Sequence, residues 1–101
     1  MEFLFTVVDR FAIEGRGVVL VPGIPHARES GAIRKGAAVR LRKPDLTQHD
    51  TEIRDLEMLN YRPNMPLEQR STPILLPKDI HKFDVPIGTE VYLLDEETQT
   101  A

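Results

Sequence analysis

The sequence predicts an all-β domain, a small barrel or sandwich, and three observations carry this prediction. Short segments rich in valine, isoleucine, leucine and phenylalanine recur along the chain. The 6 glycines and 8 prolines separate these segments into many short strands. In one segment Val39 and Leu41 alternate with Arg40 and Arg42, which is the two-residue period of a strand with one buried face.

The first two strands form a hairpin by pattern. Residues 3–13 are rich in β-branched and aromatic residues, a composition typical of strands. Gly15, Arg16 and Gly17 follow as a tight turn, and residues 18–21 form a second apolar run. Two strands joined by a short glycine-containing loop predict a β-hairpin.

The middle of the chain is divided by proline. Pro22, Gly23 and Pro25 end the second strand, and residues 26–31 are expected to form a surface loop. The alternating segment at residues 33–42 is the next strand. It ends at Lys43 and Pro44, because proline cannot donate a hydrogen bond to a β-ladder.

Residues 50–59 are ambiguous. Ile53, Leu56 and Leu59 recur at a spacing of three, which by itself predicts a short helix rather than a bulged strand.

The rest of the chain is assigned more directly. A long loop is expected at residues 60–72, strands at 73–76 and 91–94, a connector at 77–84, one domain over residues 1–94, and a flexible acidic tail at 95–101.

Composition excludes several classes of protein. In 101 residues, 41% are hydrophobic and 29% are charged, which is ordinary for one soluble globular domain. The chain has no cysteine, so disulfides, thiolate metal sites and cysteine nucleophiles are excluded. No apolar run reaches the roughly 20 residues of a membrane span, and the start lacks the basic residues of a secretory signal. We expect a cytoplasmic protein that does not bind membranes.

Charge is unevenly distributed. The formal net charge is −3, but residues 28–43 carry six basic side chains and a single acid, Glu29. This basic strip on an acidic body could steer an anionic partner, or it could be a solvated strand face. Its candidate binding residues are Arg34, Lys35, Arg40 and Arg42.

Catalytic and metal-binding patterns are weak. The two serines, Ser30 and Ser71, lie outside any Gly-x-Ser-x-Gly elbow, and the three histidines lie in predicted loops. Metal ligands could come from residues 49–52 or 79–84, but neither set has the spacing of a rigid site. We expect no enzymatic activity, no metal and no cofactor.

Four segments resemble a known family. Residues 11–19 read Phe-Ala-Ile-Glu-Gly-Arg-Gly-Val-Val, which is similar to the stretch that opens the barrel of the second domain of elongation factor Tu and related translation GTPases. Residues 31–41, 53–59 and 74–91 resemble the later strands of that barrel, in the same order. The resemblance covers residues 3–94 and implies a small closed antiparallel β-barrel, with residues 50–59 as strand rather than helix.

The chain also departs from the family. Val18 and Pro22 stand where the family usually has threonine and glycine, and residues 24–30 and 60–72 do not match the family's loops. No segment resembles a phosphate-binding loop, so nucleotide binding and GTPase activity are not expected. The domain therefore resembles the barrel alone.

Three further residues are candidates for binding. Arg16, between two glycines, could contact a phosphate, or it could hold the hairpin by bonding carbonyls or an acid on an adjacent loop. Tyr61, followed by Arg62 in the predicted long loop, is an arrangement suited to stacking on single-stranded RNA, whereas the other aromatics are expected in the core.

Two functions follow as hypotheses. The first is a stand-alone protein-interaction module, of accessory or immunity type, that binds a protein partner through residues 24–30 and 60–72. Its acidic body favours a basic partner. The second is a translation-linked module that binds tRNA or ribosomal RNA through the basic strip, as the resemblance implies. The sequence leaves the oligomeric state open.

Overall fold

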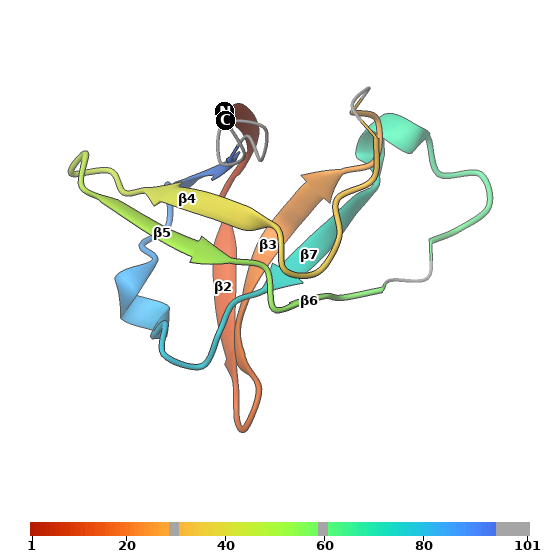
Figure 1. The fold of residues 1–101 in the computed structure, drawn as a ribbon. Coiled ribbons are helices and arrows are strands. Elements are labelled where there is room, and N and C mark those ends of the chain that lie inside the picture. The colour runs from red at the N-terminus through yellow and green to blue at the C-terminus, as the bar shows by residue number, and fades with distance from the viewer. Residues whose placement is uncertain (29–30, 59–60, 95–101) are drawn as a thin grey trace.

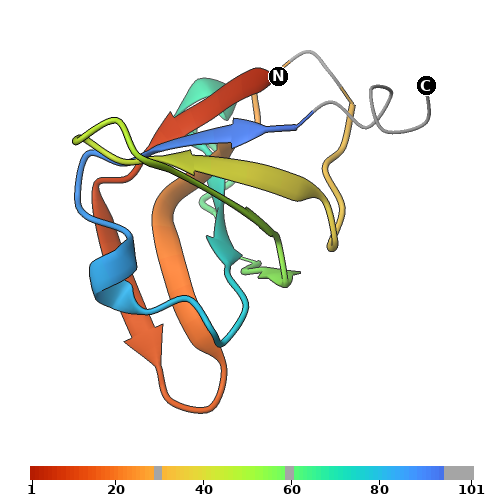
Figure 2. The same cartoon turned by 60° about the vertical axis from the view of Figure 1, so that its left-hand side comes forward.

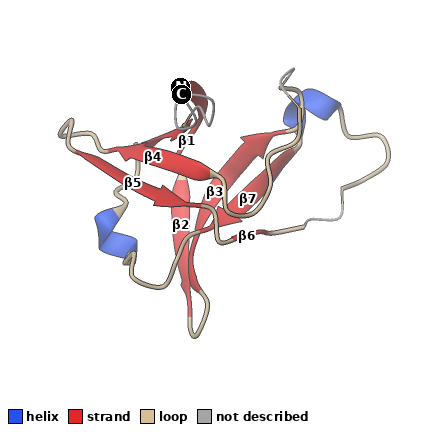
Figure 3. Ribbon diagram, viewed as in Figure 1, coloured by secondary structure: helices blue, strands red, loops and turns tan. Residues whose placement is uncertain are grey.

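A computed structural model describes residues 1–28, 31–58 and 61–94 and shows an all-β architecture of two antiparallel sheets (Figures 1 and 3). Two short 3₁₀ turns, η1 (Leu67–Gln69) and η2 (Lys82–Asp84), are the helical elements of the described residues. The predicted tail at residues 95–101 lies outside the described residues.

Each sheet has four strands. The first sheet has the order β1 (Glu2–Thr6), β8 (Glu90–Leu93), β4 (Ala38–Arg42), β5 (Gln48–Glu52). The second sheet has the order β2 (Asp9–Ile13), β3 (Gly17–Pro25), β7 (Ser71–Leu75), β6 (Asp55–Leu56). Neither sheet closes on itself within the described residues, so the predicted closed antiparallel β-barrel is not seen there as one continuous sheet.

Two of the passages from one sheet to the other are short corners, between β1 and β2 and between β5 and β6. At the first corner Val7 N donates to Thr89 O at 2.8 Å, beside the first sheet, and Val8 N donates to Val21 O on β3 at 2.9 Å. The prediction of one strand over residues 3–13 was therefore wrong. Val7 and Val8 at the corner are β-branched and equally suit a strand that continues straight, so their composition does not mark the change of sheet.

The second corner lies at Ile53. Ile53 N donates to Ala37 O at 3.0 Å, beside β4, and Arg54 N donates to Leu75 O on β7 at 2.8 Å. Residues 48–56 are thus two strands, which confirms the strand over the helix for the described part of 50–59. The spacing of Ile53 and Leu56 reflects a bend between sheets and not a helical period.

The predicted hairpin of residues 3–21 is confirmed in its second half, where β2 pairs with β3. The predicted end of the strand at Pro22 was wrong, because β3 continues to Pro25. Its pairing with β7 is interrupted after Leu20 and resumes at Ile24 opposite Thr72. Proline at the end of a strand is compatible with a ladder, since its missing N–H costs little there.

One apolar core lies between the two sheets (Figure 2). Its fully buried members come from both sheets, from both corners and from the segment between β7 and β8. They include Val7, Leu20, Val39, Leu41, Ile53, Ile74, Leu76, Val85 and Val91. The alternation predicted for β4 is confirmed, because Val39 and Leu41 are buried while Arg40 and Arg42 face outward.

In both edge strands of the second sheet, an aspartate side chain accepts a hydrogen bond from the backbone N–H of the next residue. On β2, Asp9 Oδ1 accepts a hydrogen bond from Arg10 N at 2.8 Å. On β6, Asp55 Oδ1 accepts from Leu56 N at the same distance. These backbone donors are thus occupied by the chain itself, which makes the edges poor templates for a further strand.

Candidate binding site

The basic strip is partly neutralised by acids from other parts of the chain. Arg28 makes two hydrogen bonds to Glu2, from Nε at 3.1 Å and from Nη2 at 2.6 Å. Arg40 makes two to Asp50, its partner across the β4–β5 ladder, at 2.7 and 2.9 Å. The strip is therefore less basic in the fold than in the sequence.

The Arg40–Asp50 pair changes the pKa of both side chains. The hydrogen bond from Arg40 lowers the pKa of the Asp50 carboxyl, and the same bond raises the pKa of Arg40. Both groups are exposed enough for solvent to screen their attraction. The pair links β4 to β5 side by side, and an exposed pair of this kind contributes little to stability.

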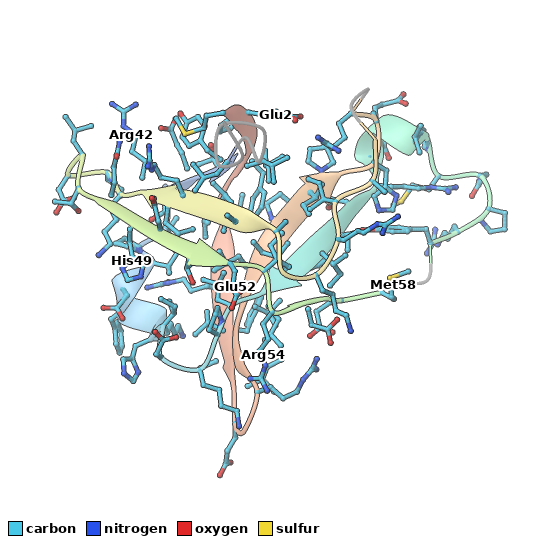
Figure 4. The ribbon with its side chains drawn as sticks, viewed as in Figure 1. Glu2, Arg42, His49, Glu52, Arg54 and Met58 are labelled. Carbon is cyan, nitrogen blue, oxygen red and sulfur yellow. The ribbon has the colours of Figure 1, made fainter. Side chains whose placement is uncertain are left out.

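The other predicted cations of the strip are spread apart. Arg34 and Lys35 lie on an exposed turn, which Gly36 N fixes against the second corner by a 2.7 Å bond to Ile53 O. Arg42 lies on β4 between Gln48 and Glu90 in register (Figure 4). Across residues 1–28, 31–58 and 61–94, these three cations form no ion pair.

Arg16 is held within the fold. Its guanidinium lies 3.0 Å from Glu57 Oε1, although this oxygen has no hydrogen-bond partner, so the contact is an ion pair without good bond geometry. Its carbonyl accepts a hydrogen bond from Arg54 Nη1. These contacts join the β2–β3 turn to the segment around β6.

Tyr61 is half-buried and its hydroxyl is engaged. It donates to Ser71 O and accepts from Ser71 N at 3.1 Å. Arg70 lies over the Tyr61 ring, 5.8 Å from its centroid, and the His26 and Tyr61 rings lie edge to face with their centroids 5.6 Å apart. Tyr61 therefore anchors the long loop to β7, while the neighbouring Arg62 is exposed.

The fold builds a groove that the sequence did not reveal. It measures about 440 Å³ and lies between the end of β3, residues 31–33 and the segment that follows β6. Figure 4 shows Met58 beyond β6, on the opposite side of the molecule from Arg42 and His49. The lining is mostly apolar: Ile24, Pro25, Ala32, Ile33, Leu56 and Met58 from these segments, with Gly31, His26, Arg28 and Thr72.

One wall of the groove is polar. His26 Nε2 lies 2.6 Å from Thr72 Oγ1, and His26 N donates to Arg70 O at 2.9 Å. Tyr61 and Arg70 lie behind His26 and do not line the groove. The guanidinium of Arg70 bonds carbonyl oxygens of residues 62, 63 and 65, and in the part of the chain that the structure describes it has no ion pair.

A second feature missed from the sequence is Leu46, on the turn between β4 and β5. Its φ is 73°, and its side chain is 67% exposed. Asp45 Oδ1 accepts hydrogen bonds from the Thr47 backbone N at 3.0 Å and from its hydroxyl at 2.6 Å. These bonds lower the pKa of Asp45. In the sequence, a leucine between the turn-forming residues Asp45 and Thr47 was the pattern that could have indicated this exposed turn.

Within the described ranges, no three histidine, aspartate or glutamate side chains gather as a metal ion would require. In the 79–84 set, Asp84 Oδ2 accepts from His81 N at 3.0 Å and so caps η2. None of the helical turns in those ranges has the length and apolar character to cross a membrane.

Comparisons with known proteins leave the chain unassigned. No protein-family model, no curated protein and no solved structure matches it. The resemblance to the second domain of elongation factor Tu therefore remains a prediction from four sequence segments.

Proposed function

We propose that this chain is a non-catalytic binding domain that holds a protein partner in the groove beside β6. The groove itself carries the proposal. Its volume of about 440 Å³ and its apolar lining with few polar groups match the usual character of binding sites. Met58, 85% exposed at this groove, suits an apolar contact because its unbranched side chain adapts to different surfaces.

The partner enters by side chains rather than by adding a strand. Leu56 N on β6 is occupied by Asp55 Oδ1, so the edge beside the groove offers one donor fewer to an incoming strand. An aliphatic or aromatic side chain can instead displace water from the apolar lining, which is favourable per unit of area buried. The polar wall of His26 and Thr72 then orients its backbone.

For the fold we propose the barrel type of translation-factor second domains. The two sheets support this proposal because consecutive strands continue from one to the other at Val7–Val8 and at Ile53–Arg54. Followed through these corners as one bent strand, β1–β2 pairs with β8 and β3, and β5–β6 pairs with β4 and β7. The Gly-Arg-Gly turn of the resemblance connects β2 and β3, which pair as a hairpin.

The test compares two variants with the same chemical change. Met58 and Phe83 are 85% and 84% exposed, so Met58→Glu and Phe83→Glu each add one charge without disturbing the core. Each protein is immobilised and used to capture partners from native lysate treated with ribonuclease, followed by mass spectrometry. We expect a protein that the wild type and Phe83→Glu retain and that Met58→Glu loses. Equal capture by all three would refute the groove as the site.

RNA binding is a second candidate, and one observation favours it. Across the outer face of the first sheet, Phe3, Tyr92 and Arg40 stand in register on β1, β8 and β4. The Phe3 and Tyr92 rings meet edge to face at 5.5 Å, and Phe3 is half exposed. Aromatic rings beside arginine are suited to stacking on bases.

The neighbouring Asp50 weakens that candidate, because it neutralises Arg40 and would repel phosphate. Fluorescence anisotropy with a labelled single-stranded RNA separates the two functions. RNA binding predicts affinity that falls steeply with salt and is reduced in Arg42→Glu. If the protein does not bind the RNA, or binds it with an affinity that does not depend on salt, the RNA-binding function is refuted and the protein-binding function remains.

A further inference from the structure

The first sheet ends at β5, and β5 is an open edge. The sheet order leaves it with β4 on one side and no strand on the other (Figure 1). All of its residues except Thr51 are exposed, and among the described elements it packs mainly against β4. Its ladder with β4 runs over all five residues without a register shift. A regular, exposed edge of this kind is a template on which another strand can pair.

The hydrogen bonds at the two ends of the β4–β5 ladder show which backbone groups face the open side. At one end Lys43 N donates to Thr47 O at 2.9 Å, and at the other Ile53 N donates to Ala37 O at 3.0 Å. Hydrogen-bonded and non-bonded pairs alternate in an antiparallel ladder, so the odd-numbered residues of β5 bond to β4. The even-numbered residues therefore direct their N–H and C=O groups away from β4.

These outward groups belong to Gln48, Asp50 and Glu52, and within the described ranges no backbone group from beyond the ladder bonds to them. The other three sheet edges are protected. Arg10 N on β2 and Leu56 N on β6 are occupied by aspartate side chains. β1 has a register shift in its ladder and lies against β3. Among the edges that the structure describes, β5 alone offers a continuous row of donors and acceptors.

The charged side chains of β5 select the strand that can pair there. Full-length antiparallel pairing of two β5 strands would set Asp50 opposite Asp50, and like charges directly opposite destabilise a sheet. A second copy of this chain therefore fits poorly. Glu52, at the corner end of β5, is exposed and has no ion pair in the described part of the chain (Figure 4). A strand with a basic residue opposite Glu52 gains an attractive cross-strand pair.

We propose that β5 binds an extended segment of a partner protein as a fifth strand of the first sheet, with a lysine or arginine of that segment opposite Glu52. Backbone bonds to the even-numbered residues of β5 supply the affinity, and the charge of Glu52 selects the partner. Residues 48–52 do not line the groove beside β6. The inference therefore goes beyond the proposed function of the groove and does not depend on it.

Amide hydrogen exchange of the full chain, measured by nuclear magnetic resonance, tests the proposal. The probe is a short peptide in which lysine alternates with threonine, so that all its lysines lie on one face when it is extended. In the free protein the amides of His49 and Thr51 should exchange slowly and those of Gln48, Asp50 and Glu52 fast. Saturating peptide should slow exchange at the three even-numbered residues roughly 10-fold, because each gains a backbone partner.

Two controls separate strand addition from attraction by charge alone. A peptide of the same sequence, methylated on the backbone nitrogens that would face β5, keeps every lysine and should bind roughly 10-fold more weakly. Glu52→Lys should weaken binding of the unmodified peptide roughly 3- to 10-fold. Glu68→Lys makes the same change in charge at an exposed site on η1, away from β5, and should bind close to the wild type (Figure 1).

Several results would overturn the inference. They are absence of peptide binding, equal binding of the methylated and unmodified peptides, and even-numbered amides that exchange equally fast with and without the peptide. Protection of these amides by rising protein concentration alone would make a second copy the occupant and the basic segment wrong. Met58→Glu, which charges the groove, should bind the peptide like the wild type. Loss of the peptide in this variant would place it in the groove and refute the β5 edge, whereas the lysate capture tests the groove independently.

Discussion

Gly17 stands where the β2–β3 turn packs against the segment that follows β7, and alanine at this position tests how tightly the two are joined. Its φ is +137°, and an added Cβ would lie 2.4 Å from Leu76 O, where real Cβ contacts stay above 3.0 Å. Leu76 has little freedom to move away, because its N–H donates to Val18 O at 2.9 Å. Gly17→Ala therefore combines an unfavourable backbone conformation with a steric overlap between the new Cβ and Leu76 O.

The magnitude follows from these two costs. The backbone conformation costs alanine about 1–3 kcal/mol, and a steric overlap in packed surroundings about 1–3 kcal/mol more. Gly15→Ala is the matched control, since its φ is +79° but nothing lies within 4 Å of the added Cβ. It should cost only about 1–2 kcal/mol. Gly17→Ala should thus destabilise by roughly 2–6 kcal/mol, a large part of the stability of a small domain.

Urea unfolding followed by far-ultraviolet circular dichroism measures both variants against the wild type. Since the slope for a small domain is about 1–3 kcal/mol per molar urea, the midpoint of Gly17→Ala should fall by roughly 1 M or more. A Gly17→Ala variant no less stable than Gly15→Ala would refute the close approach of the β2–β3 turn to Leu76.

Three further predictions concern stability. Leu46→Gly should raise the free energy of unfolding by about 1 kcal/mol, because it relieves the left-handed strain; a lower urea midpoint would contradict this. Ile53→Ala should lower it by about 2–5 kcal/mol, since Ile53 is fully buried at the second corner, and an unchanged midpoint would show that the corner is loosely packed. The lowered pKa of Asp50 stabilises the fold above the ordinary carboxyl pKa of about 3.9, and this stabilisation is lost as pH falls through the lower folded value. Melting temperatures of wild type and Asp50→Asn should therefore differ at pH 7 and converge in strong acid, and a constant difference would argue against the shift.

The elements that were predicted correctly are those whose sequence pattern lies within the element itself. The β2–β3 hairpin and β4 follow from glycine placement and from alternation, and both are present. The corners were missed because the residues at the turning points, Val7, Val8 and Ile53, are β-branched and equally suit a strand that continues straight. At the first corner, Leu4 and Phe5 are both buried across a register shift, which hides the two-residue period.

The candidate site was less predictable because its parts are distant in sequence. The ion pair between Arg28 and Glu2 spans 26 residues, so the basic strip looked more charged than it is. The groove joins segments around Ile24, Ile33 and Leu56 that only the fold brings together. Loop composition pointed to residues 24–30 as a binding segment, but it gave no sign of the opposing wall.

The place of β8 in the first sheet has a consequence for the order in which the chain is made. β8 lies between β1 and β4, so the earliest and the later strands of this sheet have no common neighbour until residues 90–93 have been synthesised. The second sheet, by contrast, needs only residues 9–75. A nascent chain can therefore assemble its second sheet on the ribosome while β1 waits unpaired. Pairing of β8 is then the step that joins β1 to β4 and assembles the first sheet.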